Sequence, residues 1–173
     1  GREVRKDKKY GQIYDHHYVE FAYDNGVIMN SQCRHQKNCW SSVSEIIIGD
    51  KGTLYLGGNP VIKDRTGKTV WQHRGKDDPD PYQTEHDRLY KAIREKTPLN
   101  NAYYGAQSTF TSILGRYATY GGKMVKWDEA LAWNNSEMPG KLGFDQPTLV
   151  QPNGDGVYKV AVPGEFDPSK PLG

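Results

Sequence analysis

No long hydrophobic run occurs in this sequence. Hydrophobic residues make up only 35% of its 173 residues. No apolar stretch approaches the roughly 18 residues that would indicate a membrane-spanning helix. A basic segment followed by a short apolar segment, the pattern of a secretory signal peptide, is also missing from these residues. We therefore predict no membrane association, and both a cytoplasmic and a periplasmic location stay open.

An excess of charge of one sign is missing too. The 23 Lys and Arg residues nearly balance the 21 Asp and Glu residues, which gives a formal net charge of +2. A charge this small does not favour a surface for nucleic acid, and we predict no nucleic-acid partner. Basic residues are densest between Arg2 and Lys9, but Glu3 and Asp7 interrupt them, which favours a solvated terminal segment.

Cysteine is scarce, with 2 residues in the chain. Cys33 and Cys39 lack the CxxC spacing of a structural zinc site and do not define a redox compartment. His16 and His17 are adjacent in an expected strand, so their side chains point to opposite faces and cannot share one metal ion. We predict no metal site and a free, buried Cys33, although a disulfide with Cys39 stays open if the intervening loop folds back.

The sequence does contain many turn and aromatic residues, with 19 Gly, 10 Pro and 12 Tyr. β-Branched runs bounded by Gly, Asn or Asp predict strands, and apolar residues three or four apart predict helices. After a hairpin between Ile13 and Gln36, the expected strands are Val43–Ile48, Thr53–Leu56, Val61–Lys63, Thr69–Trp71 and Met124–Lys126. The expected helices begin at Pro81, with Asp80 as the N-cap, and near Asn101, and Gly121-Gly122 is expected to end the second one. Asp128 is expected to cap a last helical turn through Leu131.

Strands followed by helices predict an α+β fold. We expect a mainly antiparallel, open-faced sheet with two helices packed on one face. The other face would then be solvated or covered by a partner. At 173 residues the chain is expected to be a single domain, with residues 136–173 as a long irregular tail that wraps its surface.

The hairpin between Ile13 and Gln36 is the best-marked local structure. Asn25-Gly26 between apolar runs predicts a two-residue turn, because a type I′ turn needs positive φ at both central residues. Facing residues would then have numbers that sum to 51, which pairs His16 with His35 across the strands. A three-residue turn would shift this register by one residue and move every side chain to the opposite face.

A polar cluster lies at the end of the hairpin away from the turn. Its six members are Asp15, His16, His17, Arg34, His35 and Gln36. Arg suits a carboxylate, and His and Gln can bind hydroxyl groups, so the cluster fits a sugar or polyol pocket. An Arg34–Asp15 salt bridge that only fixes the loop explains the same residues equally well. No glycine-rich nucleotide loop occurs, so we assign no catalytic and no cofactor-binding residue.

Four stretches, in order, resemble the C-terminal domain of the Gfo/Idh/MocA oxidoreductases, in the branch that contains sugar and inositol dehydrogenases. They are YGQIYDHHYVEFAYDNGVIMNSQCRHQKNCW (Tyr10–Trp40), GDKGT (Gly49–Thr53), PYQTEHDRLYKAIR (Pro81–Arg94) and YYGAQSTFTSILGRYATYGGKMVKWDEAL (Tyr103–Leu131). The resemblance covers nearly the whole chain. It implies an α/β domain whose sheet forms one wall of the substrate pocket and the usual dimer contact.

The same resemblance implies a parent enzyme with a separate Rossmann domain that binds NAD(P). The segments that carry the family's fingerprint and catalytic Lys and His have no counterpart in these residues. We therefore expect a fragment that binds no cofactor and is inactive alone, but contributes the sugar or polyol site and a homodimer contact. Two alternatives stay open: a stand-alone binding or assembly module that uses its open sheet face, and a domain of an NAD-dependent glycosidase of the same family.

Overall fold

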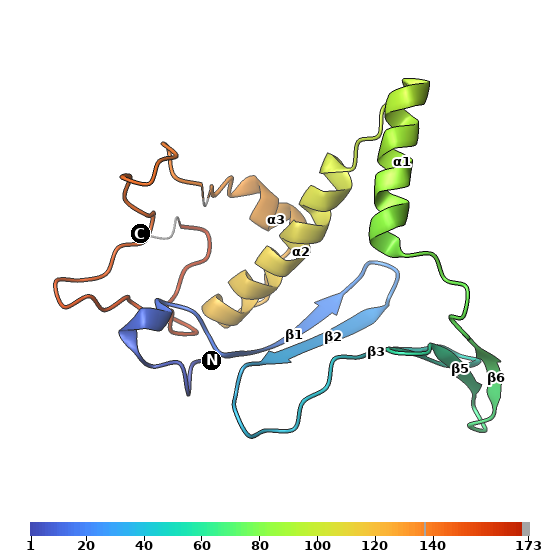
Figure 1. The fold of residues 1–173 in the computed structure, drawn as a ribbon. Helices are drawn as coiled ribbons and strands as arrows, with labels where there is room; N and C mark the ends of the chain where they lie inside the picture. Colours follow the sequence, from blue (N-terminus) through green and yellow to red (C-terminus); the bar gives the residue numbers. More distant parts are fainter. Residues whose placement is uncertain (137, 171–173) are drawn as a thin grey trace. The chain divides into compact units, whose positions relative to one another are not determined.

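The computed structural model describes residues 1–136 and 138–170 (Figure 1). A short 3₁₀ helix, η1 (Lys8–Tyr10), precedes the first strand. The strands are β1 (His16–Ala22), β2 (Ile28–Arg34), β3 (Glu45–Ile48), β4 (Gly52–Leu56), β5 (Val61–Asp64) and β6 (Thr69–Gln72). The helices are α1 (Pro81–Glu95), α2 (Ala102–Gly121) and α3 (Trp127–Ala132). The strand expected at Met124–Lys126 is not formed, so that prediction is wrong. Asp128 is not the cap of α3 as expected, because the helix begins at Trp127 with Lys126 as its N-cap and Asp128 lies in its first turn.

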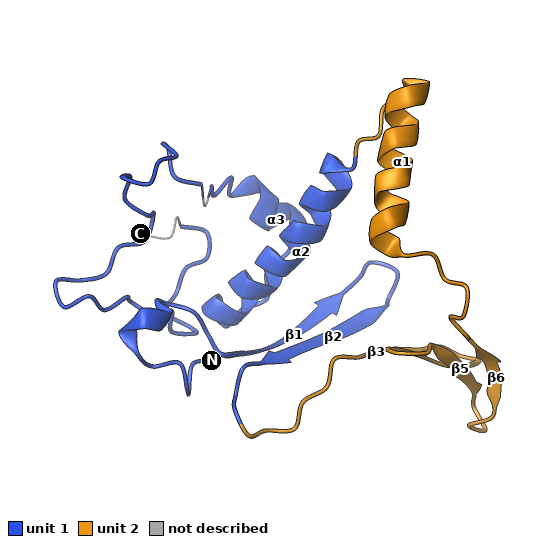
Figure 2. Ribbon diagram, in the orientation of Figure 1, with its two compact units in different colours: residues 1–37, 101–173 blue, residues 38–100 orange. Residues whose placement is uncertain are grey.

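The α+β class is confirmed, but the strands form two antiparallel sheets instead of one. β1 and β2 make a two-stranded sheet, and β3 to β6 make a four-stranded sheet in sequence order. By its contacts the chain divides into two compact units, residues 1–37 with 101–173 and residues 38–100 (Figure 2). Local patterns predict each strand, but they do not predict whether strands separated by a long loop, such as β2 and β3, will pair.

The first hairpin has the three-residue turn, so the predicted two-residue register is wrong. Tyr23 and Val27 close the loop, and the Gly26 N–H donates to the Tyr23 carbonyl at 2.9 Å. Gly26 alone in the loop has a positive φ, 84°, as expected for a type I turn followed by a bulge glycine. Facing residues therefore sum to 50, which pairs His16 with Arg34.

This register directs one face of the hairpin toward α2. Val19 and Phe21 lie on that face, and Gly115 of α2 lets them approach the helix backbone. A Cβ at Gly115 would lie 3.0 Å from the Phe21 Cζ atom and 3.5 Å from the Val19 Cγ2 atom. His17 shares the face with Val19, because alternate residues of a strand point the same way.

A small hydrophobic core lies along α2. Leu114, Tyr117 and Ala130 are its buried members. The partly buried side chains packed against them are Phe110, Ile113, Val125, Trp127 and Trp133. Gly122, with φ 63°, ends α2 in the left-handed conformation, which confirms the predicted glycine cap.

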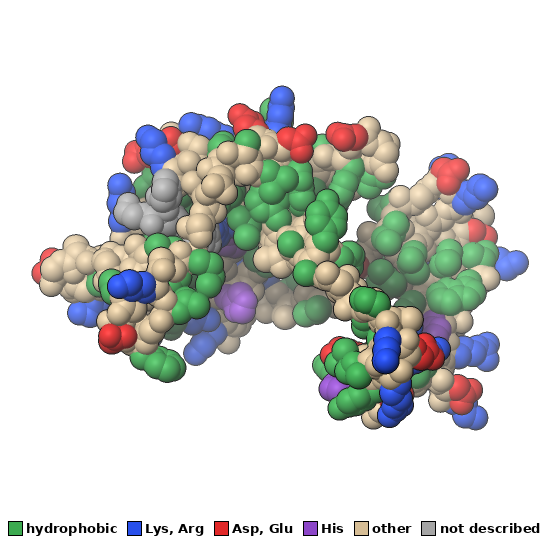
Figure 3. Space-filling model, turned by 90° about the horizontal axis from the view of Figure 1, so that it is seen from above, with side chains coloured by type: hydrophobic (Ala, Val, Ile, Leu, Met, Phe, Trp, Pro, Cys, Tyr) green, Lys and Arg blue, Asp and Glu red, His purple; other side chains and the backbone are tan. Residues whose placement is uncertain are grey.

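The unit of residues 38–100 contains the four-stranded sheet and α1. The Asp80 carboxylate accepts the Gln83 N–H at 2.8 Å, and Pro81 begins the helix, so the predicted N-terminus of α1 is confirmed. None of residues 38–100 is buried. Hydrophobic side chains are therefore visible among the surface atoms (Figure 3). No helix in the described part of the chain is both long enough and apolar enough to cross a membrane.

The segment after α3 contacts the same unit as the first hairpin. Its described residues, through 170, contain no helix or strand. The Gly164 N–H donates to the Gly121 carbonyl at 2.9 Å, and the Tyr14 hydroxyl donates to the Ala161 carbonyl at 2.8 Å. These bonds hold the segment against the end of α2 and the start of the hairpin.

Candidate functional site

The observed register divides the predicted polar cluster between the two faces of the hairpin. Asp15 is buried against the N-terminal segment, and His17 is half-buried on the face that meets α2. His16 faces Arg34 on the opposite side. His35 is exposed, and its N–H donates to the Asp15 carbonyl at 2.8 Å. Gln36, just beyond β2, is half-buried.

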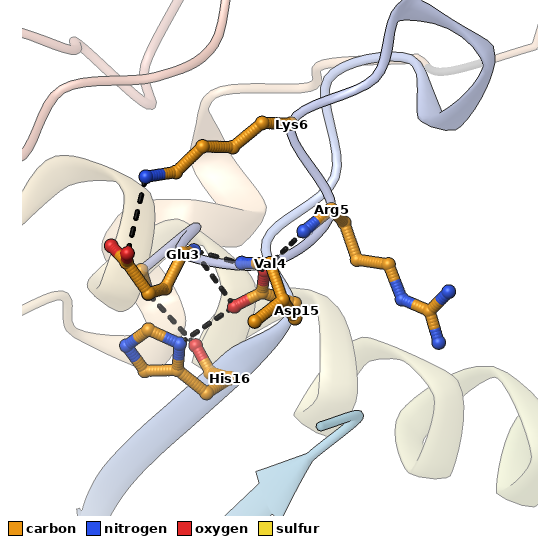
Figure 4. Close-up of polar contacts among 7 residues, drawn as sticks. Glu3, Val4, Arg5, Lys6, Asp15 and His16 are labelled. Atoms are coloured by element: carbon orange, nitrogen blue, oxygen red, sulfur yellow. Dashed lines mark hydrogen bonds and ion pairs between the residues drawn. The ribbon is translucent and has the colours of Figure 1, made fainter. Parts of the chain in front are cut away.

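Asp15 binds the N-terminal segment (Figure 4). Its Oδ2 atom accepts the backbone N–H groups of Glu3, Val4 and Arg5 at 2.9, 2.6 and 2.8 Å. Its Oδ1 atom lies 2.8 Å from the His16 Nδ1 atom. Only 3% of the residue is exposed. The contacts of this carboxylate therefore have a structural role: Asp15 fixes the N-terminal segment and the His16 ring.

The ionisation of Asp15 depends on these hydrogen bonds. Burial by itself would raise the pKa of the carboxyl group, because a charge is poorly solvated in the interior. The Arg5 N–H, the His16 ring and the Val4 and Glu3 N–H groups outweigh burial and hold the pKa well below its usual value. Asp15 is consequently a carboxylate over the whole physiological pH range.

His17 contacts α2. Its Nδ1 atom lies 3.0 Å from the Thr119 hydroxyl oxygen, and that hydroxyl donates to the Arg116 carbonyl at 3.0 Å. The single hydroxyl proton is thus already used, so we assign the proton between the two groups to His17 Nδ1. In the neutral ring Nε2 then keeps its lone pair and can accept a hydrogen bond.

The surroundings of His17 favour the neutral ring. Burial lowers its pKa most, followed by the positive charges of the N-terminus and His16, and the Asp15 carboxylate opposes them. Because the pKa is below its ordinary value, the lone pair on Nε2 persists at neutral pH.

Two tyrosines complete this region, and sequence reasoning missed both. Tyr14 and Tyr120 are buried, their ring centroids are 4.4 Å apart, and His17 lies 5.6 and 6.2 Å from them. Arg116 lies over the Tyr120 ring at 5.9 Å. Tyr120 also belongs to the apolar stripe of α2. It follows Tyr117 by three positions and continues the stripe, a signal that was available in the sequence.

The arrangement places the neutral His17 imidazole beside two buried aromatic rings, whereas Arg34 lies with His16 on the other face of the hairpin. Groups of this kind bind hydroxyls and aliphatic ring faces of uncharged polar ligands. Across residues 1–136 and 138–170, no three His, Cys, Asp or Glu side chains are placed to hold a metal ion. Cys33 is exposed, not buried as expected, and neither it nor Cys39 forms a disulfide.

Comparison with known proteins gives no relative. No protein-family model, no curated protein and no solved structure matches this chain.

Proposed function

We propose that this chain is the substrate-binding and dimerisation domain of an NAD(P)-dependent oxidoreductase that acts on a sugar or polyol. The observation that supports this most directly is His17. Its Nδ1–H is committed to Thr119, and its unprotonated Nε2 is suited to accept a substrate hydroxyl. The buried rings of Tyr14 and Tyr120 pack beside the His17 imidazole and hold it in position. The four stretches that resemble the Gfo/Idh/MocA family, in the same order, support the assignment to an oxidoreductase that uses NAD(P).

The described residues do not fit NAD(P) itself. A dinucleotide site needs parallel strands joined through a glycine-rich turn to a helix N-terminus. All the strand pairs described here are antiparallel. We therefore derive no hydride-transfer step from this chain, and the cofactor would bind a separate Rossmann domain of the parent enzyme. Calorimetric titration of the chain with NAD tests this, and micromolar affinity would contradict it.

Substitution of His17 should weaken polyol binding. We expect the chain to bind myo-inositol weakly, and His17→Ala to reduce the affinity about tenfold, because one hydrogen bond contributes roughly 1 kcal/mol and the aromatic contact adds to it. The measurement is an NMR titration that follows the His17 ring and the Gln36 side-chain amide.

His86→Ala is the matched control for this substitution. His86 is also a histidine whose Nδ1 atom bonds a neighbouring group, the Tyr82 carbonyl at 2.7 Å, but it is exposed on α1. Its substitution should leave the polyol affinity unchanged. Equal losses in the two variants, or an unchanged affinity in His17→Ala, would remove His17 from the site.

The four-stranded sheet supplies the surface that we propose for dimerisation. Facing residues share a side of the sheet, so the register defines one apolar row across all four strands. This row, called the Ile47 row, consists of Ile47, Leu54, Ile62 and Trp71. Ile47 is 57% exposed and Trp71 is 47% exposed. On the opposite face the corresponding row ends at Gln72 and has Lys63 beside it, which makes that face less apolar.

A charge in the Ile47 row should break the dimer. Ile47→Glu would bury a carboxylate in an apolar interface, and we expect the dimer dissociation constant to rise about a hundredfold, as for a typical hot-spot residue. Ile46→Glu is a closely matched control, because Ile46 is the neighbouring residue, is 56% exposed and faces the other way. Analytical ultracentrifugation measures both. A wild-type monomer at all concentrations, or equal losses in the two variants, would contradict the proposed dimer surface.

The same exposed row also supports the second candidate, a stand-alone binding or assembly module. Polyol binding separates the two: it supports the oxidoreductase domain, whereas dimerisation is compatible with both. A domain of an NAD-dependent glycosidase would bind the same class of ligand through the same residues.

A further inference from the structure

A cleft lies between the N-terminal segment and the segment after α3, apart from the His17 site. Its volume is about 340 Å³, within the range of roughly 300–1,000 Å³ that is usual for small-molecule sites. Its lining residues are Arg2, Lys6, Lys8, Gly11, Val157, Tyr158 and Val160. A second cleft of about 320 Å³ adjoins it through Val157 and Tyr158 and adds Lys159.

The positive charges of the cleft are only partly neutralised. Both terminal nitrogens of Arg2 donate to backbone carbonyls, to Gly11 at 2.5 Å and to Asp7 at 3.2 Å. Lys8 donates to the Asp155 carbonyl at 3.4 Å. A carbonyl fixes a cation without removing its charge, so Arg2 and Lys8 bring positive charge to the same cleft.

Two of the acidic groups nearby are paired with lysines, one of them Lys6 of the cleft itself, and a third is bonded to backbone N–H groups. The Glu3 carboxylate pairs with Lys6 at 3.1 Å, and the Asp7 carboxylate lies 3.9 Å from Lys9. Asp15 accepts the N–H groups of the same N-terminal segment and is buried. Among the described residues that line the cleft, none is acidic.

We propose that this cleft binds a small phosphorylated organic molecule. The dianionic phosphate would contact Arg2 and Lys8, with Lys6 exchanging its exposed pairing with Glu3 for the ligand. Arg and Lys donate charge-assisted hydrogen bonds to phosphate oxygens, and several cations suit a doubly charged group better than a single carboxylate. Val157 and Val160 would contact the non-polar part of the ligand.

The fixed Arg2 makes this cleft different from a solvated basic segment. Its two bonds to Gly11 and Asp7 hold the guanidinium in one position before any ligand arrives. Pre-organisation of this kind reduces the entropy lost on binding. In this proposal the segment Arg2–Lys9, which the sequence predicted to be only solvated, provides the cations that bind the phosphate.

The test uses glycerol 3-phosphate as the probe and glycerol as its uncharged counterpart. In an NMR titration of the whole chain, glycerol 3-phosphate should shift the amide signals of Gly11 and Val157, and glycerol should not. The Lys6→Gln/Lys8→Gln variant should weaken binding at least about tenfold, since it removes two cations that donate charge-assisted hydrogen bonds to the phosphate. Both lysines are exposed, so the variant retains its fold, which its amide spectrum verifies.

A second variant controls for general charge. Lys123→Gln/Lys141→Gln removes the same two charges from exposed positions that line neither cleft. It should keep wild-type affinity. The proposal is overturned if the probe does not bind, if glycerol binds equally well, or if the two double variants lose the same affinity. Citrate binding as tightly as the phosphate would overturn the assignment to phosphate. Neither lysine pair touches His17, so this result is independent of the polyol titration.

Discussion

Asp15→Asn is expected to lower the free energy of unfolding by about 3 kcal/mol, because the lost interactions are hydrogen bonds to a buried charge. The carboxylate accepts three backbone N–H groups and the His16 ring. An asparagine would direct its NH₂ group at some of these donors and leave them unpaired. Urea denaturation followed by circular dichroism measures the change.

Asp64→Asn is the control for this loss. The Asp64 carboxylate also accepts several groups, the Thr66 N–H and hydroxyl and the Lys68 N–H, but in a solvent-exposed turn. Water replaces those partners, so a much smaller loss is expected. If the two variants were equally destabilised, burial of Asp15 would not be the cause.

The pH dependence of the Asp15 variant follows from the sign of the pKa shift. The folded pKa of Asp15 is depressed, because the N–H groups outweigh the effect of burial. A group of this kind stabilises the fold above its unfolded pKa, about 3.9, and that contribution is lost as the pH falls through the folded pKa. The difference in stability between wild type and Asp15→Asn should therefore be constant above about pH 5 and shrink below about pH 4.

Leu114→Ala is expected to cost about 3 kcal/mol of unfolding free energy, the second large effect. Leu114 belongs to the small core along α2, together with Tyr117 and Ala130, and only 9% of it is exposed. Removing its side chain loses buried apolar contacts and leaves a cavity, which together cost roughly 2–5 kcal/mol in protein cores. Thermal and urea denaturation measure it.

Leu131→Ala is the control, because it removes the same side chain from a more exposed position. Leu131 is in α3, near the same core, but is 52% exposed. Its substitution should cost less than about 1 kcal/mol. A loss at Leu131 as large as that at Leu114 would mean that the core extends across α3 instead of centring on α2.

Local chemistry determined the element boundaries that the sequence predicted well. Asp80 and Pro81 begin α1, and Gly122 ends α2, because caps depend on residues within one turn of the helix end. The strands followed by helices likewise predicted the α+β class. These predictions needed no knowledge of distant residues.

The turn of the first hairpin shows where local reasoning was insufficient. Asn25-Gly26 is compatible with a two-residue turn and with a three-residue turn that has only Gly26 at positive φ. The two alternatives differ by one residue, yet that residue decides which cluster members share a face. The register that forms places Arg34, not His35, opposite His16.

The sequence by itself determined most of the elements, the caps at Asp80 and Gly122, the class of the fold and the candidate residues at the base of the hairpin. Only the tertiary structure decided that Asp15 supports the N-terminal segment and that His17 meets Thr119, 102 positions away. It also decided that the strands divide into two sheets. The physical reason is range: propensities and caps act over a few residues, whereas pairing and burial depend on segments that the chain brings together only when it folds.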